Sequence, residues 1–292
     1  MSDFWLHIHN TQPEEGLALA RLAEEVGFAG VLGDDHWFMP ALSANHDPDE
    51  PAPLPMDYIF PDFFAFGAAV MAQTKLRFGS CIMVLANRTN PFLVAKSAAT
   101  LARMSDDRFI LGVGIGWMRE EYDVAGVPWA DRVPRTVEMI EIMRKLWGPP
   151  PVEHHGRFFD FPATYANPRP RKPVPLYMGG LAPASLRRTG RIADGWMGHS
   201  CTLDGLPTQL ALIEEGRAEA GRTGEPFAIM AGLARNTGGA LPDLDDFRRA
   251  QDLGVAHHHV GPIDHRLGKL YSSFEEKRRV VEEFGERIIR RY

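Results

Sequence analysis

The sequence has few cysteines, no excess of positive charge and no apolar run long enough to cross a bilayer. Cys81 and Cys201 are the only cysteines, and their separation argues against a disulfide framework or a thiolate metal site. The net charge of −6 at pH 7 argues against nucleic acids and anionic membranes as partners. Because the start, Met1-Ser2-Asp3, also lacks the basic segment of a signal peptide, we expect a cytoplasmic protein.

A dinucleotide-binding fingerprint is also missing, although one apolar segment is rich in glycine. Residues 109–113 have the pattern of a strand buried on both faces, and Gly112, Gly114 and Gly116 alternate along its end. A GxGxxG motif would need a glycine at position 117, where the chain has Trp117. The glycines allow backbone or a flat ligand to come close to this strand end, and a simple packing turn is the alternative.

Short apolar segments alternate with amphipathic segments along the chain. The predicted strands cover residues 4–8, 28–33, 76–84, 109–113, 174–178, 195–198, 227–233 and 255–260. The predicted helices cover residues 14–26, 59–73, 90–104, 132–147, 183–192, 206–220, 243–252 and 273–290. This alternation predicts an α/β fold, a closed (β/α)8 TIM barrel formed by residues 1–292 as one domain, with its active site at the C-terminal ends of the strands.

Two proline-rich stretches interrupt the alternation. Residues 40–61 contain six prolines, and a loop of this length predicts a functional lid or pocket wall. Residues 148–173 contain seven prolines together with Phe158, Phe159 and Phe161, which need a surface to pack against. We expect an insertion here, after the fourth βα unit, that contains a short hairpin.

Polar and small residues gather where the predicted strands end. Asp35 and His36 follow the second strand, where a histidine can exchange protons near neutral pH or can instead bond to a turn backbone. Gly179 and Gly180 precede a helix, where backbone amides and the helix dipole form a phosphate site or an ordinary turn. Strand alternation directs one or two of the histidines at 257–259 inward.

Histidines on the first strand raise an alternative of a different class, a metal-dependent hydrolase of the amidohydrolase type. His7 and His9 are two residues apart and point the same way, as metal ligands do on the first strand of such barrels. Those barrels also need ligands on the middle strands, and here only His199 and the histidines at 257–259 could complete the set. We therefore expect no metal site.

A series of motifs in fixed order extends over residues 13–200. It includes GDDH at 33–36, LRFGS at 76–80, RFILGVGIGW at 108–117, GG at 179–180 and DGW at 194–196. With these motifs the chain resembles the luciferase-like monooxygenase superfamily, and within it the oxidoreductases that use coenzyme F420, a deazaflavin. The resemblance implies a TIM barrel that is commonly a homodimer and acts on a small-molecule substrate.

The resemblance also implies a cofactor site. Residues 114–116 would lie beside the deazaflavin ring, a cis peptide bond between Cys81 and Ile82 would support the ring, and residues 179–182 match the phosphate-binding loop. The residues that match cofactor-binding positions are Cys81, Ile82, Gly114, Gly116, Gly179, Gly180, Leu181 and Ala182.

In the family, the pair that matches Asp35 and His36 is catalytic, and the histidine resembles a general base that takes a hydroxyl proton while a hydride passes to F420. The residues expected to line the substrate pocket are His9, Trp37, Trp117 and His199. Alcohol-oxidising members carry a glutamate where this chain has Ile115, so that reduction of a carbonyl or unsaturated substrate stays open. A luciferase-like monooxygenase that uses FMN and oxygen is the close alternative.

Overall fold

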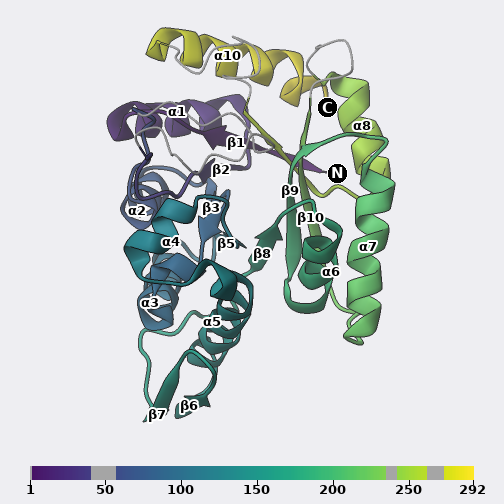
Figure 1. Cartoon of the computed structure of the whole chain (residues 1–292). Helices are drawn as coiled ribbons and strands as arrows, with labels where there is room; N and C mark the ends of the chain where they lie inside the picture. Colours follow the sequence, from purple (N-terminus) through teal and green to yellow (C-terminus); the bar gives the residue numbers. More distant parts are fainter. Residues whose placement is uncertain (1, 41–56, 235–241, 262–272) are drawn as a thin grey trace.

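The computed structural model describes residues 2–40, 57–234, 242–261 and 273–292, and its main sheet closes into a barrel (Figure 1). The strands of this sheet are β1 (Asp3–Ile8), β2 (Gly30–Gly33), β3 (Arg77–Ser80), β4 (Met83–Val84), β5 (Phe109–Gly114), β8 (Leu176–Gly179), β9 (Gly195–Cys201), β10 (Ala228–Leu233) and β11 (His257–Val260). They are ordered β3-β2-β1-β11-β10-β9-β8-β5-β4, and a further pairing of β3 with β5 closes the ring. All these pairs are parallel, which confirms the predicted TIM barrel.

Helices between the strands cover the outside of the barrel. The α-helices are α1 (Pro13–Val26), α2 (Phe63–Gln73), α3 (Pro91–Met104), α4 (Arg119–Ala125), α5 (Arg132–Trp147), α6 (Pro183–Ile192), α7 (Leu206–Glu219), α8 (Leu244–Asp252) and α10 (Phe274–Arg287). The short 3-10 helices are η1 (Ala86–Arg88), η2 (Trp129–Asp131) and η3 (Ile289–Arg291). In the described parts of the chain, no helix has both the length and the hydropathy needed to span a bilayer.

The predicted helices all occur, with two differences. The helix predicted from residue 59 begins at Phe63, because the carboxylate of Asp62 accepts a hydrogen bond from the backbone of Ala65 and caps the first turn. The helix α4 was not predicted, since seven residues are too few to show a clear helical period.

The strand predicted over residues 76–84 is divided in two. β3 ends at Ser80, the peptide bond between Cys81 and Ile82 is cis, and β4 begins at Met83. The cis bond lies where the family resemblance implies it. β4 pairs with the end of β5, so Cys81 and Ile82 lie at the C-terminal mouth of the barrel.

The expected hairpin in the 148–173 insertion is confirmed. β6 (Val152–His155) and β7 (Asp160–Thr164) are antiparallel and project away from the barrel beyond α5 (Figure 1). Phe161 of the hairpin contacts Phe92 of α3, with ring centroids 4.8 Å apart. This contact gives the aromatic residues of the insertion the packing surface that they require.

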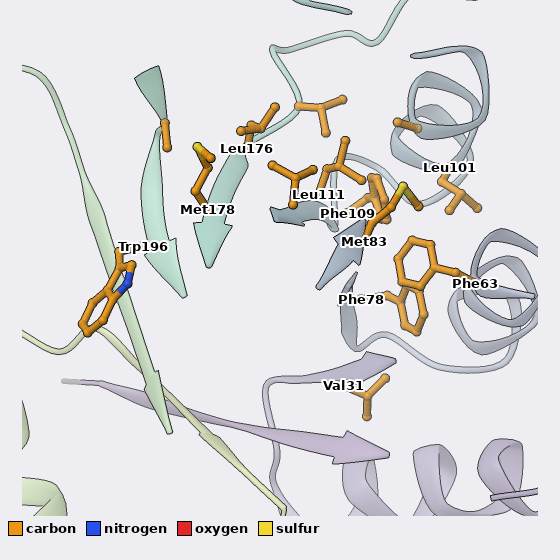
Figure 2. Close-up of a cluster of buried hydrophobic side chains, with 14 of the residues drawn as sticks. Val31, Phe63, Phe78, Met83, Leu101, Phe109, Leu111, Leu176, Met178 and Trp196 are labelled. Carbon is orange, nitrogen blue, oxygen red and sulfur yellow. The ribbon is translucent and has the colours of Figure 1, made fainter. Parts of the chain in front are cut away.

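Side chains on the outer side of the strands form an apolar layer with the helices (Figure 2). Phe63 of α2 stacks on Phe78 of β3 at 5.0 Å between ring centroids, and both rings are buried. Gly67 of α2 is required beside them, because a Cβ atom there would lie 2.4 Å from the Phe78 ring. Burial of each such side chain stabilises the fold by roughly 1.5–3 kcal/mol.

Inside the barrel, an apolar floor lies below a polar mouth. The floor consists of Trp5, Leu32, Ile110, Tyr177, Met197 and Met230, all buried. Side chains alternate along a strand, so the inward series that begins with Trp5 continues with His7 and His9 toward the C-terminal end. The polar groups at the mouth therefore lie above a buried apolar layer.

The two ends of the described chain meet around His258 of β11. Nε2 of this histidine lies 3.0 Å from Oγ of Ser2 and 3.4 Å from the hydroxyl of Tyr292. The imidazole is fully buried and packs against the rings of Phe4 and Phe247. This burial disfavours the charged form and lowers the pKa of His258 to about 4.

We predict that His258 makes the protein sensitive to acid. With a pKa of about 4 in the folded chain and 6.5 when unfolded, the unfolded state binds more protons between these values. Stability is thus complete above pH 6.5 and is lost as the pH falls toward 4, by about 3 kcal/mol. In urea unfolding across this range, His258→Phe should show a shallower fall than the wild type.

The control for this measurement is His155→Ala, which removes an exposed histidine of the hairpin. It should leave the pH dependence of the unfolding free energy unchanged. An identical acid fall in the wild type and His258→Phe would contradict a neutral, buried His258.

Candidate active site

A buried carboxylate, Glu121, organises one side of the barrel mouth. It lies in the first turn of α4, where the helix dipole favours a negative charge. Oε1 of Glu121 is 3.1 Å from Nδ1 of His36 and accepts a hydrogen bond from the Trp37 backbone at 2.7 Å. Oε2 accepts another from Nδ2 of Asn87 at 3.0 Å. We call these four residues the His36 network.

This network fixes the protonation pattern of the imidazole. A carboxylate at Nδ1 favours a proton on that nitrogen, so that Nε2 of neutral His36 carries the lone pair. The imidazole also contacts the rings of Trp117 and Phe60, at 5.5 and 5.1 Å between centroids. The imidazole of His36 is therefore positioned between two aromatic rings, where it can act as a base or an acid.

Asp35, which the sequence groups with His36 as catalytic, has a different partner. Its carboxylate is buried and forms an ion pair with Arg88 of η1. The guanidinium of Arg88 in turn lies 5.4 Å from the centroid of the Trp37 ring. The structure thus places Asp35 behind the rim, where it positions Arg88 and Trp37, and the carboxylate beside His36 belongs to Glu121.

Across the mouth, residues from β1, β9 and β11 and the end of β2 form a histidine cluster, which consists of His7, His9, Asp34, His199 and His259. Nε2 of His7 is 2.7 Å from Oδ1 of Asp34, and Nδ1 of His9 is 3.7 Å from Oδ2. The rings of His199 and His259 stack at 5.7 Å. Burial raises the pKa of Asp34 above its usual value of 3.8.

A cavity of about 200 Å³ opens from the histidine cluster. His7, His9, His199 and His259 line one end of it. The apolar side chains of the lining come from β10, α8 and α10 and are Leu233, Phe247, Val280 and Phe284, and the charged residues Asp243, Glu283 and Arg287 also line the cavity. The cavity combines a few polar groups with apolar walls, as small-molecule sites do.

At the ends of β5 and β8, the barrel presents an apolar platform. The side chain of Ile82 fills the space over the ends of β5 and β8, and a Cβ atom on Gly114 or Gly179 would lie 2.3 or 2.5 Å from its Cδ1. Gly116 likewise gives room to Val84, because a Cβ there would be 2.6 Å from it. The missing side chains thus leave a smooth surface that suits a flat ring.

The loop before α6 is open at the rim. Gly180 adopts a φ of +118°, which favours glycine, and its carbonyl accepts a hydrogen bond from Nε1 of Trp196 at 3.1 Å. Leu181 and Ala182 are exposed, and the N-cap residue Ala182 makes no side-chain hydrogen bond to the helix. Pro183 has no N–H, and the amides of Ser185 and Leu186 bond to the carbonyl of Ala182, so the amide of Ala184 and those of the exposed loop are the ones that can face an anion such as a phosphate.

The structure brings together most of the residues that the sequence singles out. Trp37 and Trp117 stand beside His36, and His9 and His199 lie together in the histidine cluster. Cys81 lies between this cluster and Ile82, and burial raises the pKa of its thiol. Of the predicted loop at 40–61, residues 41–56 lie outside the described residues.

No role was predicted for four residues of the site, namely Glu121, Asn87, Arg88 and Asp34. Glu121 offered one signal, an acidic residue in a short segment directly after a glycine-rich strand end. Nothing local marks Asn87 and Arg88, because their partners follow β2 or lie in α4.

Comparison with known proteins gives a family match and named relatives. The family model described as Luciferase-like monooxygenase matches residues 1–235. An uncharacterised protein of Mycobacterium tuberculosis is 35% identical in an alignment of 295 positions, which covers 99% of this chain and 96% of that protein. An F420-dependent glucose-6-phosphate dehydrogenase of Microbacterium testaceum is 31% identical over 216 residues, which are 72% of this chain and 60% of the relative.

Solved structures show the same fold. An F420-dependent secondary alcohol dehydrogenase in complex with an F420-acetone adduct superposes with a TM-score of 0.76 at 21% identity, with 99% of each chain covered. The monooxygenase RslO1 from Streptomyces bottropensis superposes with a TM-score of 0.76 at 22% identity, also over 99% of each chain. At these identities the likeness concerns the fold alone.

We predict that Glu121 stabilises the barrel mouth. Glu121→Ala leaves the donors on Trp37, Asn87 and His36 without their buried acceptor, which should lower the unfolding free energy by about 3 kcal/mol. The measurement is chemical unfolding followed by circular dichroism.

Asp123→Ala, on the exposed side of the same helix, is the matched control and should change little. Equal stability of Glu121→Ala and Asp123→Ala would show that the network does not hold the mouth together.

Proposed function

The chain belongs to the luciferase-like monooxygenase family, and from this membership we propose that it is an oxidoreductase that uses coenzyme F420. It transfers a hydride between the deazaflavin and a small organic substrate at the C-terminal mouth of the barrel. The relatives that are named as F420-dependent support this choice of cofactor. The observation that carries the proposal is the apolar platform beside the His36 network.

The platform and the α6 loop suit the two ends of such a cofactor. Cys81, Ile82, Gly114 and Gly116 would hold the flat ring system, because Ile82 fills the Cβ positions of Gly114 and Gly179, Val84 fills that of Gly116, and no further side chain projects from these glycines. The loop at 179–182, with its available amides, would hold the phosphate. When bound, F420 supplies the carbon that gives or accepts the hydride.

His36 accepts or donates the proton that accompanies the hydride. In alcohol oxidation, its Nε2 takes the hydroxyl proton as the carbonyl forms, and in reduction the protonated imidazole returns a proton to the product. Glu121 stabilises the imidazolium in both directions, since its carboxylate is 3.1 Å from Nδ1. Glu121 thereby offers this site a carboxylate although Ile115 occupies the position of the glutamate in alcohol-oxidising relatives.

The lining of the cavity supports a substrate with an apolar part. Leu233, Phe247 and Phe284 favour a hydrocarbon or aromatic group, while the histidine end favours an oxygen function. Trp37 and Trp117, 37% and 40% exposed, lie beside His36 and are not part of the lining of this cavity.

One observation supports a second candidate function, that of an FMN-dependent monooxygenase. The monooxygenase structure and the F420-dependent alcohol dehydrogenase structure superpose equally well on this chain. The fold is therefore common to both enzyme classes, and the choice between the cofactors depends on the ligand that binds.

We predict that the purified protein binds oxidised F420 with micromolar affinity and FMN much more weakly. The measurement is a titration of each cofactor followed by fluorescence. Gly180→Val should weaken F420 binding at least tenfold, because its Cβ would lie 2.4 Å from Oγ of Ser185 and the φ of +118° disfavours side chains. Tight FMN binding without F420 binding would favour the monooxygenase.

We predict that His36→Ala lowers turnover by about 10²–10⁴-fold while F420 binding stays unchanged, because only the proton transfer is lost. Turnover is followed by F420 absorbance, with a panel of alcohols against oxidised F420 and a panel of carbonyl compounds against reduced F420. Glu121→Gln should lower turnover less, since an amide oxygen still orients the imidazole but carries no charge.

His155→Ala, a histidine of the distant hairpin, is the control and should keep full turnover. Full turnover of His36→Ala would remove His36 from the mechanism.

A further inference from the structure

The histidine cluster contains a compact set of metal-ligating atoms that the hydride chemistry does not use. His7 lies in β1, His9 directly follows this strand, and Asp34 directly follows the neighbouring strand β2. One ligand atom from each lies within 4.8 Å of the other two. In a tetrahedral zinc site with bonds of about 2.0 Å, ligand atoms are about 3.3 Å apart. The observed separations are 2.7 Å from Nε2 of His7 to Oδ1 of Asp34 and 3.7 Å from Nδ1 of His9 to Oδ2, on either side of this value, and a rotation of the carboxylate brings one oxygen toward both imidazoles.

Charge and burial at this point also favour a cation. The side chains of His7 and Asp34 are 4% and 15% exposed, so the carboxylate lies in a region of low dielectric. Its ion pairs among the described residues are to His7 and His9, whereas the nearby guanidinium of Arg88 binds Asp35. A buried carboxylate beside two imidazoles, with no guanidinium in the pair, is a donor set of the kind that divalent cations occupy.

We propose that His7, His9 and Asp34 bind a divalent cation of borderline hardness, of which Zn²⁺ is the representative. Two imidazole nitrogens and one carboxylate oxygen match the ligands that zinc prefers. Because His7 and His9 line the cavity, the fourth coordination position faces it and takes an oxygen ligand such as a carboxylate or a carbonyl group. This site departs from the expectation of no metal, and it goes beyond the proposed hydride transfer.

A second set of donors at the mouth is less suitable. His7, Cys81, His199 and His259 also have ligand atoms within 4.8 Å of one another. However, Nε2 of His259 is 2.8 Å from the carbonyl oxygen of Gly198, and the Cys81 thiol is kept protonated by its burial. The set with Asp34 offers a carboxylate oxygen between two imidazoles instead, and the test below separates the two.

The test measures metal binding by the full-length chain in the absence of F420. The protein is stripped with a chelator, dialysed against Zn²⁺ and analysed for bound metal, and Co²⁺ replaces zinc for absorption spectra. We expect one zinc per chain in the wild type and in His155→Ala, which removes an exposed histidine paired with Asp160. We expect no stoichiometric zinc in His9→Ala or in the isosteric Asp34→Asn, with circular dichroism to verify folding.

The outcomes separate the proposal from its alternatives. A cobalt spectrum without a thiolate charge-transfer band, lost in Asp34→Asn and kept in Cys81→Ser, supports the proposed ligands. Absence of stoichiometric zinc in the wild type overturns the proposal, and so does retention of zinc in Asp34→Asn with loss in Cys81→Ser or His199→Ala. F420 binding is measured separately, so a failure of the metal site leaves the proposed function standing and the reverse also holds.

Discussion

The mouth of this barrel depends on one carboxylate that is withdrawn from water. Glu121 accepts hydrogen bonds from the backbone after β2 and from the turn after β4, and it orients His36. Two segments that are distant in sequence therefore share a single acceptor, which a third segment, α4, carries. Because a buried carboxylate is costly unless its donors are in place, the three segments are positioned together or not at all. The apolar platform and the aromatic walls around His36 both stand on this arrangement.

Local sequence patterns were sufficient to predict the barrel and to locate the ends of its strands. The apolar segments and the amphipathic helices between them have different periods, so their alternation predicts the parallel (β/α)8 fold without any long-range information. The break at Cys81 was different, because residues 76–84 read as one continuous strand and only the family resemblance placed a cis bond there. Periodicity indicates the direction in which side chains point, and it contains no information on whether a peptide bond is cis or trans.

From the sequence, a residue of the candidate site could be predicted only where its own position at the end of a strand was the signal. Gly114 and Gly179 were visible in the sequence, but Ile82, the side chain that requires their missing Cβ atoms, comes from another strand connection. In the same way Asp35 is adjacent to His36 in sequence, whereas the carboxylate that contacts it is 85 positions away. Partner choice at the mouth is set by barrel closure, which no local pattern records.

The pairing of β1 with β11 gives the folding of this chain a definite order. Asp3 is in register with His257, so the first strand acquires its second neighbour only after nearly the whole polypeptide has left the ribosome. Until then, one edge of β1 has unpaired amide and carbonyl groups, which is the kind of edge that associates with other chains. Such a barrel gains from a chaperone or from slow release of its early strands during synthesis, because the seam that completes it is made last.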